Sequence, residues 1–558
     1  MKILLIVVIS MFFIGVVSCK LLQKKNKADL VLLNGVVWTV EPEKPSVNAV
    51  AIKGEYILSI GTSKKIKGFI GKHTRVIDLN GRLVLPGFID SHTHFLEGGL
   101  SLSRIQLHEV SSPEEFIAKI KAKAAELNKG NWILSGNWDH QRFDPPELPK
   151  KDWIDSVTPY NPVCVNRHDG HMLLANSLAL KKAGITKHTE SPLGGEILKD
   201  PKTGEPTGIL KDAAMGLVLR VIPEPSLDEK IKAAELALKH ANSFGVTSIH
   251  DMAGLENFEI YQRLLKDNKL TARISVYVPI KEADNIDGLK KQLSVKNPFL
   301  KIAGLKGFVD GSLGSSTALF FDSYLDDTNN RGLLVSDMFP EGAMEKRISL
   351  ADKDGLQVAV HAIGDKANHM ILDIFERVIA QNGKKERRWR IEHAQHLIME
   401  DIQRIANLRV ITSVQPYHLV DDGQWAEKKI GNERCRLTYA FKSIIDHEVI
   451  LACGSDWTVA PLDPLTGIYA AVTRRTRDGK NPQGWFPEQK ISLEEAIKGY
   501  TLNGAYAEFS EGTKGSIKKG KFADLVVLSH NLFDIPPEKI NETEVQITIL
   551  NGKVIYMK

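Results

Sequence analysis

Eight short apolar segments, rich in β-branched residues, recur along the middle of this chain and alternate with helical patterns. They read LVLPGFID, VTSIHDM, RISVYVP, LKGFVDG, LQVAVHA, WRIEHAQ, VITSVQP and VILACGSD. Continuous apolar strands separated by helices are typical of a parallel sheet that helices cover. Eight such units predict an α/β fold, a (β/α)8 barrel of the TIM type.

The chain is longer than a bare barrel, which takes about 250 residues. It has 558 residues, of which 43% are hydrophobic and 25% charged, as in a folded globular protein. The first crossover, from about 95 to 225, contains a helix capped by Ser112 and two strand-like stretches, NWILSGNW and NPVCVNRH. Structureless loops of this length are uncommon. We therefore predict a folded insertion after strand 1 that covers the barrel mouth.

Both ends of the chain have a different sequence pattern, in which turn residues separate short β segments. Residues 28–80 and 510–558 share it, so we predict one small β-sandwich composed of both termini, with the barrel at 81–509. The pairs Asn34-Gly35, Asn80-Gly81 and Asn551-Gly552 are hairpin signals.

The first residues indicate export. An apolar run from Ile3 to Val17 is short for a membrane span, which needs about 20 residues, but it suits a signal peptide. The following VVSC resembles a bacterial lipobox, so we expect a lipoprotein signal peptide at 1–19, lipidation of Cys19 and a tether at 20–27. The alternative is an uncleaved anchor helix. Either way, we expect a membrane-anchored protein of the cell envelope.

The net charge and the cysteine content exclude two features, nucleic-acid binding and a disulfide framework. A net charge of +5 is mild for this length and there is no basic stripe interleaved with aromatic residues, which argues against nucleic-acid binding. Cys164, Cys435 and Cys453 lack C-x-x-C spacing, so we expect buried thiols rather than a disulfide framework. The oligomeric state stays open.

Two histidines follow the first predicted strand. His92 and His94 are two residues apart, and on a strand such residues point the same way. The C-terminal ends of barrel strands are where active sites form. Taken alone, an H-x-H pair also fits two polar residues that close a strand.

Three further polar residues end other strands. His361 ends the fifth strand, His393 the sixth and Asp456 the eighth, so all five side chains should converge at the barrel mouth. Imidazole and carboxylate ligands without a thiolate favour zinc, with iron, manganese or cobalt as alternatives. A metal site with open positions is typical of catalysis, because the ion lowers the pKa of water towards ~7. Asp456 would then carry the proton as a catalytic residue.

Lys306 lies inside the fourth apolar strand. A bare ammonium there is costly, and the side chain has two interpretations. It either reaches out of the barrel along its alkyl stem, or its neutral amine takes up CO2 and bridges two metals as a carbamate.

The motifs GFIDSHTH, LKGFVDGSLGSSTA, HAIGD, IEHAQ and GSDW, in this order, resemble the amidohydrolase superfamily. Together with RHDGHMLLANS they are most similar to its amidohydrolase 3 or YtcJ-like branch, which includes N-substituted formamide deformylase. The resemblance implies a metal-dependent hydrolase of C–N bonds with one or two ions. It assigns His92, His94 and Asp456 to one metal, His361 and His393 to the other, and a carboxylated Lys306 to the bridge.

Several other residues are candidates for contact with a small amide substrate. In the insertion these are Arg167, Asp169 and His171, of which His171 is a candidate catalytic residue that stabilises an oxyanion. Trp138, Asp310 and Trp457 are further candidates, although core packing is the commoner role of a residue like Trp138. His250 and Asp251, with Asp310, are candidates for orienting ligands. His396 and His418 are treated as ordinary polar residues.

The sequence thus predicts hydrolysis of an amide or formamide-like bond, other than a peptide bond, by metal-activated water. A cyclic-amide hydrolase or a deaminase is the enzymatic alternative, although deaminases commonly carry a glutamate where this chain has Gly364-Asp365 after the fifth strand. An alternative of another class is a non-catalytic solute-binding lipoprotein. The identity of the substrate lies beyond the sequence.

Overall fold

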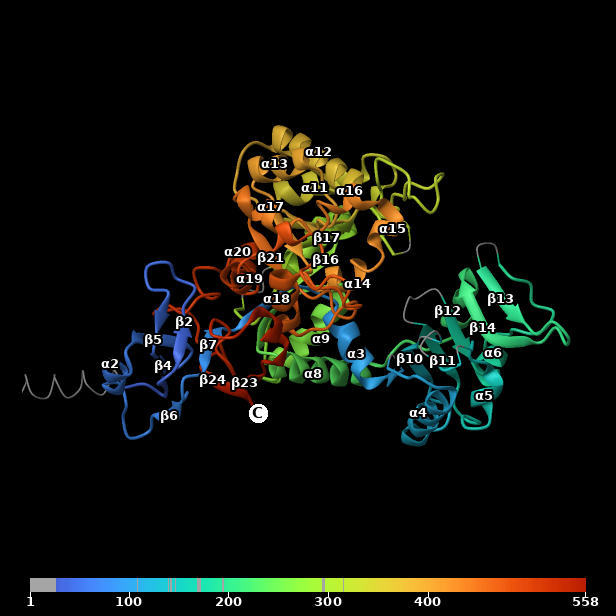
Figure 1. Ribbon diagram of the computed structural model, residues 1–558, viewed down its shortest axis with the longest axis horizontal. Coiled ribbons are helices and arrows are strands. Elements are labelled where there is room, and N and C mark those ends of the chain that lie inside the picture. The colour runs from blue at the N-terminus through green and yellow to red at the C-terminus, as the bar shows by residue number, and fades with distance from the viewer. Residues whose placement is uncertain are drawn as a thin grey trace, which may run out of the picture. The chain divides into compact units, whose positions relative to one another are not determined.

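The structure, a computed structural model, describes residues 27–558 except 108, 139, 141–142, 146, 168–171, 193–194, 294–296 and 315. It divides into two compact units, residues 27–95 with 238–558 and residues 96–237 (Figure 1). Cys19, Asp169 and His171, named above, lie outside the described residues.

Eight parallel strands form the central sheet of the first unit, and they confirm the predicted barrel fold. In chain order the strands are β8 (Phe88–Thr93), β15 (Val246–Met252), β16 (Arg273–Pro279), β17 (Leu300–Phe308), β18 (Gln357–Ala362), β19 (Arg390–His393), β20 (Ile411–Val414) and β21 (Leu451–Cys453). The sheet closes beyond β21, where the Asp456 amide donates to His92 O at 2.7 Å and the His94 amide to Trp457 O at 2.8 Å. This closure places the end of the eighth strand against the end of the first.

Helices connect the strands of the barrel. They are α8 (Leu227–Ser243), α9 (Leu255–Lys266), α10 (Ile286–Leu293), α11 (Ala343–Lys353), α12 (Asp365–Asn382), α13 (Met399–Leu408), α14 (His418–Asp422), α15 (Ala426–Ile430), α16 (Asn432–Cys435) and α17 (Phe441–Asp446), followed by α18 (Pro464–Thr473), α19 (Leu493–Gly499) and α20 (Leu502–Ala507). Capping pairs predicted from sequence start two of them. Ser226 and Glu229 exchange hydrogen bonds before α8, as do Ser492 and Glu495 before α19.

The segment LVLPGFID is two strands rather than one. Its first half, β7 (Leu83–Pro86), pairs with β2 and β22 in another sheet, and only β8 enters the barrel. The break lies at Gly87, where a Cβ atom would sit 2.3 Å from Thr247 Oγ1. Glycine is therefore required where the chain passes from one sheet to the other.

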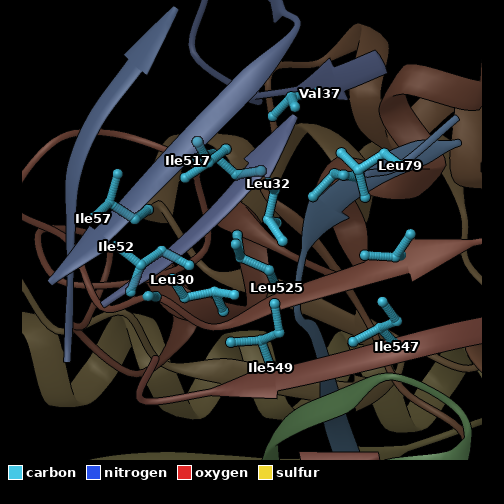
Figure 2. Close-up of a cluster of buried hydrophobic side chains, with 14 of the residues drawn as sticks. Leu30, Leu32, Val37, Ile52, Ile57, Leu79, Ile517, Leu525, Ile547 and Ile549 are labelled. Carbon is cyan, nitrogen blue, oxygen red and sulfur yellow. The ribbon is translucent and has the colours of Figure 1, made fainter. Parts of the chain in front are cut away.

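Both ends of the chain build a β-sandwich, as predicted. One sheet has the order β5-β4-β1-β6 and the other β24-β23-β22-β7-β2-β3, so strands from both termini share a sheet. The strands are β1 (Leu30–Leu33), β2 (Val36–Trp38), β3 (Ser46–Val47), β4 (Ala49–Lys53), β5 (Tyr56–Gly61), β6 (Arg75–Asp78), β22 (Leu525–Leu528), β23 (Val545–Leu550) and β24 (Lys553–Met557), with helix α2 (Ser63–Lys67) after β5. Leu32 and Ile52 from one sheet pack with Leu525 and Ile549 from the other (Figure 2).

Of the three predicted hairpins, one is confirmed and two are wrong. Asn551 and Gly552, both with positive φ, join the antiparallel strands β23 and β24. The pairs Asn34-Gly35 and Asn80-Gly81 instead lead from a strand of one sheet to a strand of the other, β1 to β2 and β6 to β7. A sharp turn signal fixes the local reversal but not the sheet that the next strand joins.

The insertion after the first barrel strand is the second unit. Its six-stranded sheet has the order β13-β14-β12-β11-β10-β9, and two of the strands are the predicted NWILSGNW and NPVCVNRH stretches. The strands are β9 (Ile105–Gln106), β10 (Ile133–Trp138), β11 (Val163–Arg167), β12 (Met172–Ala175), β13 (Gly195–Lys199) and β14 (Pro206–Asp212). The helices are α3 (Phe95–Ser103), which begins one residue before this unit, α4 (Pro113–Glu126), α5 (Lys151–Asp155), α6 (Ser177–Lys182) and α7 (Gly216–Leu219). Ser112 caps α4, as expected.

Within the described residues, no helix combines the length and the apolar character that crossing a bilayer requires. Cys164, Cys435 and Cys453 are buried free thiols.

Candidate metal centre

The predicted metal-ligating residues meet at the C-terminal ends of the barrel strands. His92 belongs to β8 and His94 directly follows it, Lys306 lies in β17 and His361 in β18. His393 ends β19, and Asp456 follows β21 by three residues. His393 and Asp456 both have positive φ, 73° and 56°, which is uncommon for residues other than glycine and typical of functional sites.

His92, His393 and Asp456 form the tightest group. One ligand atom from each lies within 4.8 Å of the other two, and all three residues are buried. His94 Nε2 lies 3.3 Å from Asp456 Oδ1, and the His361 ring centroid is 4.5 Å from that of His393. The structure therefore brings together all five predicted histidine and aspartate ligands.

Neighbouring side chains fix two of the imidazoles. His92 Nδ1 lies 2.5 Å from Glu392 Oε2, and His393 Nδ1 lies 2.7 Å from Gln415 Oε1. Gln415 Nε2 donates to Ser413 O at 3.4 Å, which turns its oxygen towards His393. In both histidines Nδ1 carries the hydrogen, so each Nε2 presents a lone pair. Neither Glu392 nor Gln415 stood out in the sequence. Glu392 contacts a strand 300 residues away in the chain, and Gln415 lies on the strand that follows that of His393, so neither contact leaves a local motif.

His361 is oriented differently. Its Nε2 lies 3.1 Å from Gly311 O and 3.5 Å from Asp310 Oδ1. Asp310 in turn accepts backbone hydrogen bonds from Leu319, Ile363 and Gly364 at 2.8–3.0 Å. Burial raises the pKa of Asp310 to about 7. Asp310 is buried and holds the loop after β17 against the loop after β18, as an orienting group does, whereas a substrate-binding role requires access.

Lys306 points into the barrel rather than out of it. Its side chain is buried, and within the described part of the chain its Nζ has no hydrogen-bond partner and lies 4.4 Å from the centroid of the Phe308 ring. Burial lowers the pKa of the amine to about 8. A neutral amine in this position can react with CO2, which is what the carbamate interpretation requires.

Two unsatisfied atoms show that the cluster fits a cation. Lys306 Nζ and Asp456 Oδ1 are both buried and lack hydrogen-bond partners among the described residues. An unpartnered buried polar atom costs about 1–3 kcal/mol. Imidazole and carboxylate donors suit a divalent ion such as zinc. Bound metal would satisfy the carboxylate oxygen, and a carboxylated Lys306 would add oxygen ligands, so the residues present fit the group.

Asp456 is ionised in this setting. Burial alone would raise its pKa, but the His94 imidazole beside Oδ1 outweighs that effect and holds the pKa of Asp456 well below its usual range. Asp456 Oδ2 also lies 3.9 Å from His418 Nε2.

His418, which we expected to be an ordinary polar residue, belongs to this cluster. It begins α14, and its ring stacks on His393 with centroids 6.3 Å apart. Its buried Nε2 has no hydrogen-bond partner in the described residues. The signal that could have revealed it is its place just after β20, at the same end of the barrel as the other ligands.

The other residues predicted to bind the substrate lie in different parts of the structure. Trp457 packs between two aromatic rings. Its ring centroid lies 5.9 Å from that of Phe95 and 5.3 Å from that of His240. Trp138 has 0% exposure in a core of the inserted unit and donates to Val165 O, which disagrees with the substrate contact predicted for it because the ring is inaccessible. Arg167 ends β11 of that unit.

Comparison with known proteins accounts for the cluster. A family model described as the amidohydrolase family matches residues 75–556. The chain belongs to the amidohydrolase family. The candidate metal centre at the barrel mouth thus belongs to a chain of a hydrolase family, and the match supports a metal-dependent hydrolase with a divalent ion.

Three relatives are similar to this chain over nearly its whole length. Protein LONG AFTER FAR-RED 3 of Arabidopsis thaliana is 42% identical, covering 95% of this chain and 92% of that protein. The putative amidohydrolase YtcJ of Bacillus subtilis is 32% identical, covering 94% and 98%. N-substituted formamide deformylase of Arthrobacter pascens is 25% identical, covering 95% and 98%. These matches place the chain in the YtcJ-like branch of the amidohydrolase superfamily.

A solved structure of a metal-dependent hydrolase is also similar to this chain. An uncharacterized metal-dependent hydrolase from Pyrococcus horikoshii OT3 has 27% sequence identity and a TM-score of 0.76, covering 91% of this chain and 99% of that chain.

Proposed function

We propose that this amidohydrolase cleaves an amide or formamide-like C–N bond of a small molecule with water. The observation that carries the proposal is the buried group of His92, His393 and Asp456, whose ligand atoms lie within 4.8 Å of one another. Similarity to N-substituted formamide deformylase along 95% of the chain supports the bond type. Zinc is the proposed ion, because the donors are nitrogen and oxygen and no thiolate is among them.

Each residue of the site has its own proposed role in the reaction. A bound divalent ion would lower the pKa of water and polarise the substrate carbonyl. His92 and His393 offer their Nε2 lone pairs, and Lys306, once carboxylated, would offer oxygens. Asp456 is an ionised carboxylate at the centre of the cluster, so it can accept the proton of the attacking water and deliver it to the departing amine.

His418 is proposed to contact the substrate. Its Nε2 has no hydrogen-bond partner among the described residues and lies 3.9 Å from Asp456 Oδ2, the carboxylate proposed to transfer the proton. A hydrogen bond from this nitrogen would stabilise negative charge that develops on the substrate oxygen. His171 and Asp169, which lie outside the described residues, stay predictions.

The structure weakens the deaminase alternative. Asp365 stands near the position where deaminases carry a glutamate, but its Oδ1 accepts the Phe321 amide at 2.9 Å, at the start of α12. A carboxylate held in that way fastens the loop after β17 to the start of α12. Opening of a cyclic amide stays a variant of the proposed reaction, because the same groups serve both.

The decisive experiment measures release of amine or acid from N-formyl, N-acyl and cyclic amides. Activity should depend on divalent metal, and Asp456→Asn should abolish turnover while the protein stays folded. Binding of these compounds without turnover by metal-loaded protein would favour the non-catalytic alternative instead.

We also propose that the mature protein is a lipoprotein anchored through Cys19. The support is the sequence VVSC after a 15-residue apolar run. Mass spectrometry of the N-terminal peptide should detect a diacylglyceryl thioether, which Cys19→Ser removes along with membrane association. An unmodified Met1 start in membrane fractions would indicate an anchor helix.

A further inference from the structure

Charged and polar side chains fill the barrel interior next to His92. Barrels of this kind are usually filled by branched apolar residues, yet Arg390, Glu392 and His250 are all buried inside this one with 0% exposure. A buried charge is costly unless it is paired. These side chains should therefore form one connected arrangement, and their distances show that they do.

Glu392 contacts the metal ligand directly. Its Oε2 lies 2.5 Å from His92 Nδ1, and a carboxylate in an ion pair can only accept a hydrogen bond. The hydrogen of the neutral imidazole must therefore be on Nδ1. This leaves the lone pair on Nε2, which faces the cluster and lies 3.7 Å from Asp456 Oδ1.

Arg390 holds Glu392 in place. Its Nε lies 2.7 Å from Glu392 Oε1, and its Nη2 donates to Oε2 at 3.1 Å. The guanidinium is itself fixed by Ser91 O at 2.5 Å, Ser413 Oγ at 2.8 Å and His250 Nδ1 at 2.9 Å. Residues of β8, β15, β19 and β20 thus set the position of a carboxylate that one histidine uses.

The arrangement continues away from the metal end. His250 accepts from Arg390 through Nδ1, so its hydrogen lies on Nε2, which is 3.6 Å from Glu508 Oε1. Glu508 pairs with Lys514 and, at 3.1 Å, with Lys301. Glu508 is therefore a buried carboxylate of the same arrangement that does not touch His92.

We propose that Glu392, held by Arg390, is a positioning residue that fixes the tautomer and ring orientation of His92 for metal binding. The inference rests on the proposed metal site. It goes beyond that site by assigning the residue that prepares one ligand. Partners of this kind typically contribute about 10–100-fold to metal affinity.

The test is metal affinity, measured by competition of a chromophoric chelator for Zn²⁺ and Co²⁺. Glu392→Gln keeps the size of the side chain but removes its charge, and we expect a loss of about 10–100-fold. Glu508→Gln is the matched control, because it neutralises a buried carboxylate of the same arrangement without touching His92. We expect its affinity to stay within about two-fold of the wild type.

A double-mutant cycle separates positioning from general damage. In a His92→Ala background, Glu392→Gln should cause no further loss of affinity, because the ligand through which Glu392 acts is gone. Leaving Arg390 unpaired can prevent folding. If it does, Arg390→Met with Glu392→Gln removes both charges and should show the same loss of affinity.

Two results would overturn the inference. Wild-type affinity in a folded Glu392→Gln protein is one, and equal losses in Glu392→Gln and Glu508→Gln are the other. Both leave the proposed function intact as long as the wild type binds metal. Failure of the wild type itself to bind a divalent ion would overturn the proposed function together with the inference.

Discussion

At the scale of single residues, the centre combines groups of two kinds. The Nδ1 atoms of His92 and His393 are held by Glu392 and Gln415, respectively. Each Nε2 is therefore oriented as a ligand before any ion binds. Lys306 Nζ and His418 Nε2 are buried without partners in the described residues. Because such atoms are costly unless they are used, they mark where an ion and a substrate are expected to contact the protein.

His418→Asn should lower turnover by about 10²-fold or more, as loss of an oxyanion donor does, and leave the metal content unchanged. His447→Asn is a suitable control. His447 is the C-cap of α17, and its Nδ1 lies 2.8 Å from the backbone carbonyl oxygen of Ser443 in the same helix. Steady-state kinetics and metal analysis on both variants provide the measurement. A loss of metal in His418→Asn would instead make His418 a ligand.

The ligating residues could be predicted from sequence, whereas their partners could not. His92, His94, His361 and His393 are visible because each stands at or just after the end of a continuous apolar segment. Glu392 is invisible because it reaches His92 across the barrel, where β8 and β19 are not neighbours in the sheet. Pairings between distant strands are a property of the closed barrel and leave no local pattern.

At the scale of elements, junctions between strands and helices decide how the site is supported. Gly87 separates β7 of the sandwich from β8 of the barrel, a break that the apolar pattern hides because both strands are buried. A continuous apolar segment indicates burial but not the sheet to which a strand belongs.

Gly87→Ala should destabilise the protein by about 1–3 kcal/mol, because an added methyl group would overlap the Thr247 side chain. The ideal Cβ lies 2.3–2.9 Å from three atoms of that residue. Gly216→Ala is the control, since nothing lies within 4 Å of its added Cβ. Urea unfolding of the two variants measures the difference, and equal stability would contradict the explanation given for this break.

Asp352 links α11 to the segment between α12 and β19. Arg387 donates to both carboxylate oxygens at 2.8 and 3.1 Å, and Asn382 donates at 2.9 Å. Burial alone would raise the pKa of Asp352, but these donors lower it below 3.8. A carboxyl group with a lowered pKa stabilises the fold above its unfolded pKa, and this contribution is lost as the pH falls through the folded value.

Asp352→Asn should therefore cost about 2 kcal/mol at pH 7, and the difference from wild type should shrink below pH 3.8, the ordinary pKa of an aspartate. Thermal unfolding of both proteins between neutral and acidic pH tests this. A difference that stays constant with pH would show that packing rather than charge accounts for the role of Asp352.

At the scale of the whole molecule, the barrel and the sandwich of the first unit share a buried ion pair. Arg273 of β16 contacts Asp524, just before β22, through two hydrogen bonds of 2.7 and 3.1 Å. Its guanidinium also lies 3.9 Å from the centroid of the Phe522 ring. The two sheets should therefore unfold together.

Asp524→Asn should cost about 3–5 kcal/mol, because it leaves a buried guanidinium without its charged partner. Replacing both partners, Arg273→Met with Asp524→Leu, should cost much less, since neither charge then remains buried. Calorimetry of the two variants gives the comparison. If the double replacement is as damaging as the single one, the pair matters through its shape rather than its charge.

The most direct test of the account is the divalent metal content of the folded protein, purified without chelators and measured by elemental analysis. We predict about one or two ions per chain, removed by chelation and absent when His92 and Asp456 are both replaced by asparagine. A folded wild-type protein that retains no divalent ion after incubation with zinc, iron, manganese or cobalt would contradict the account.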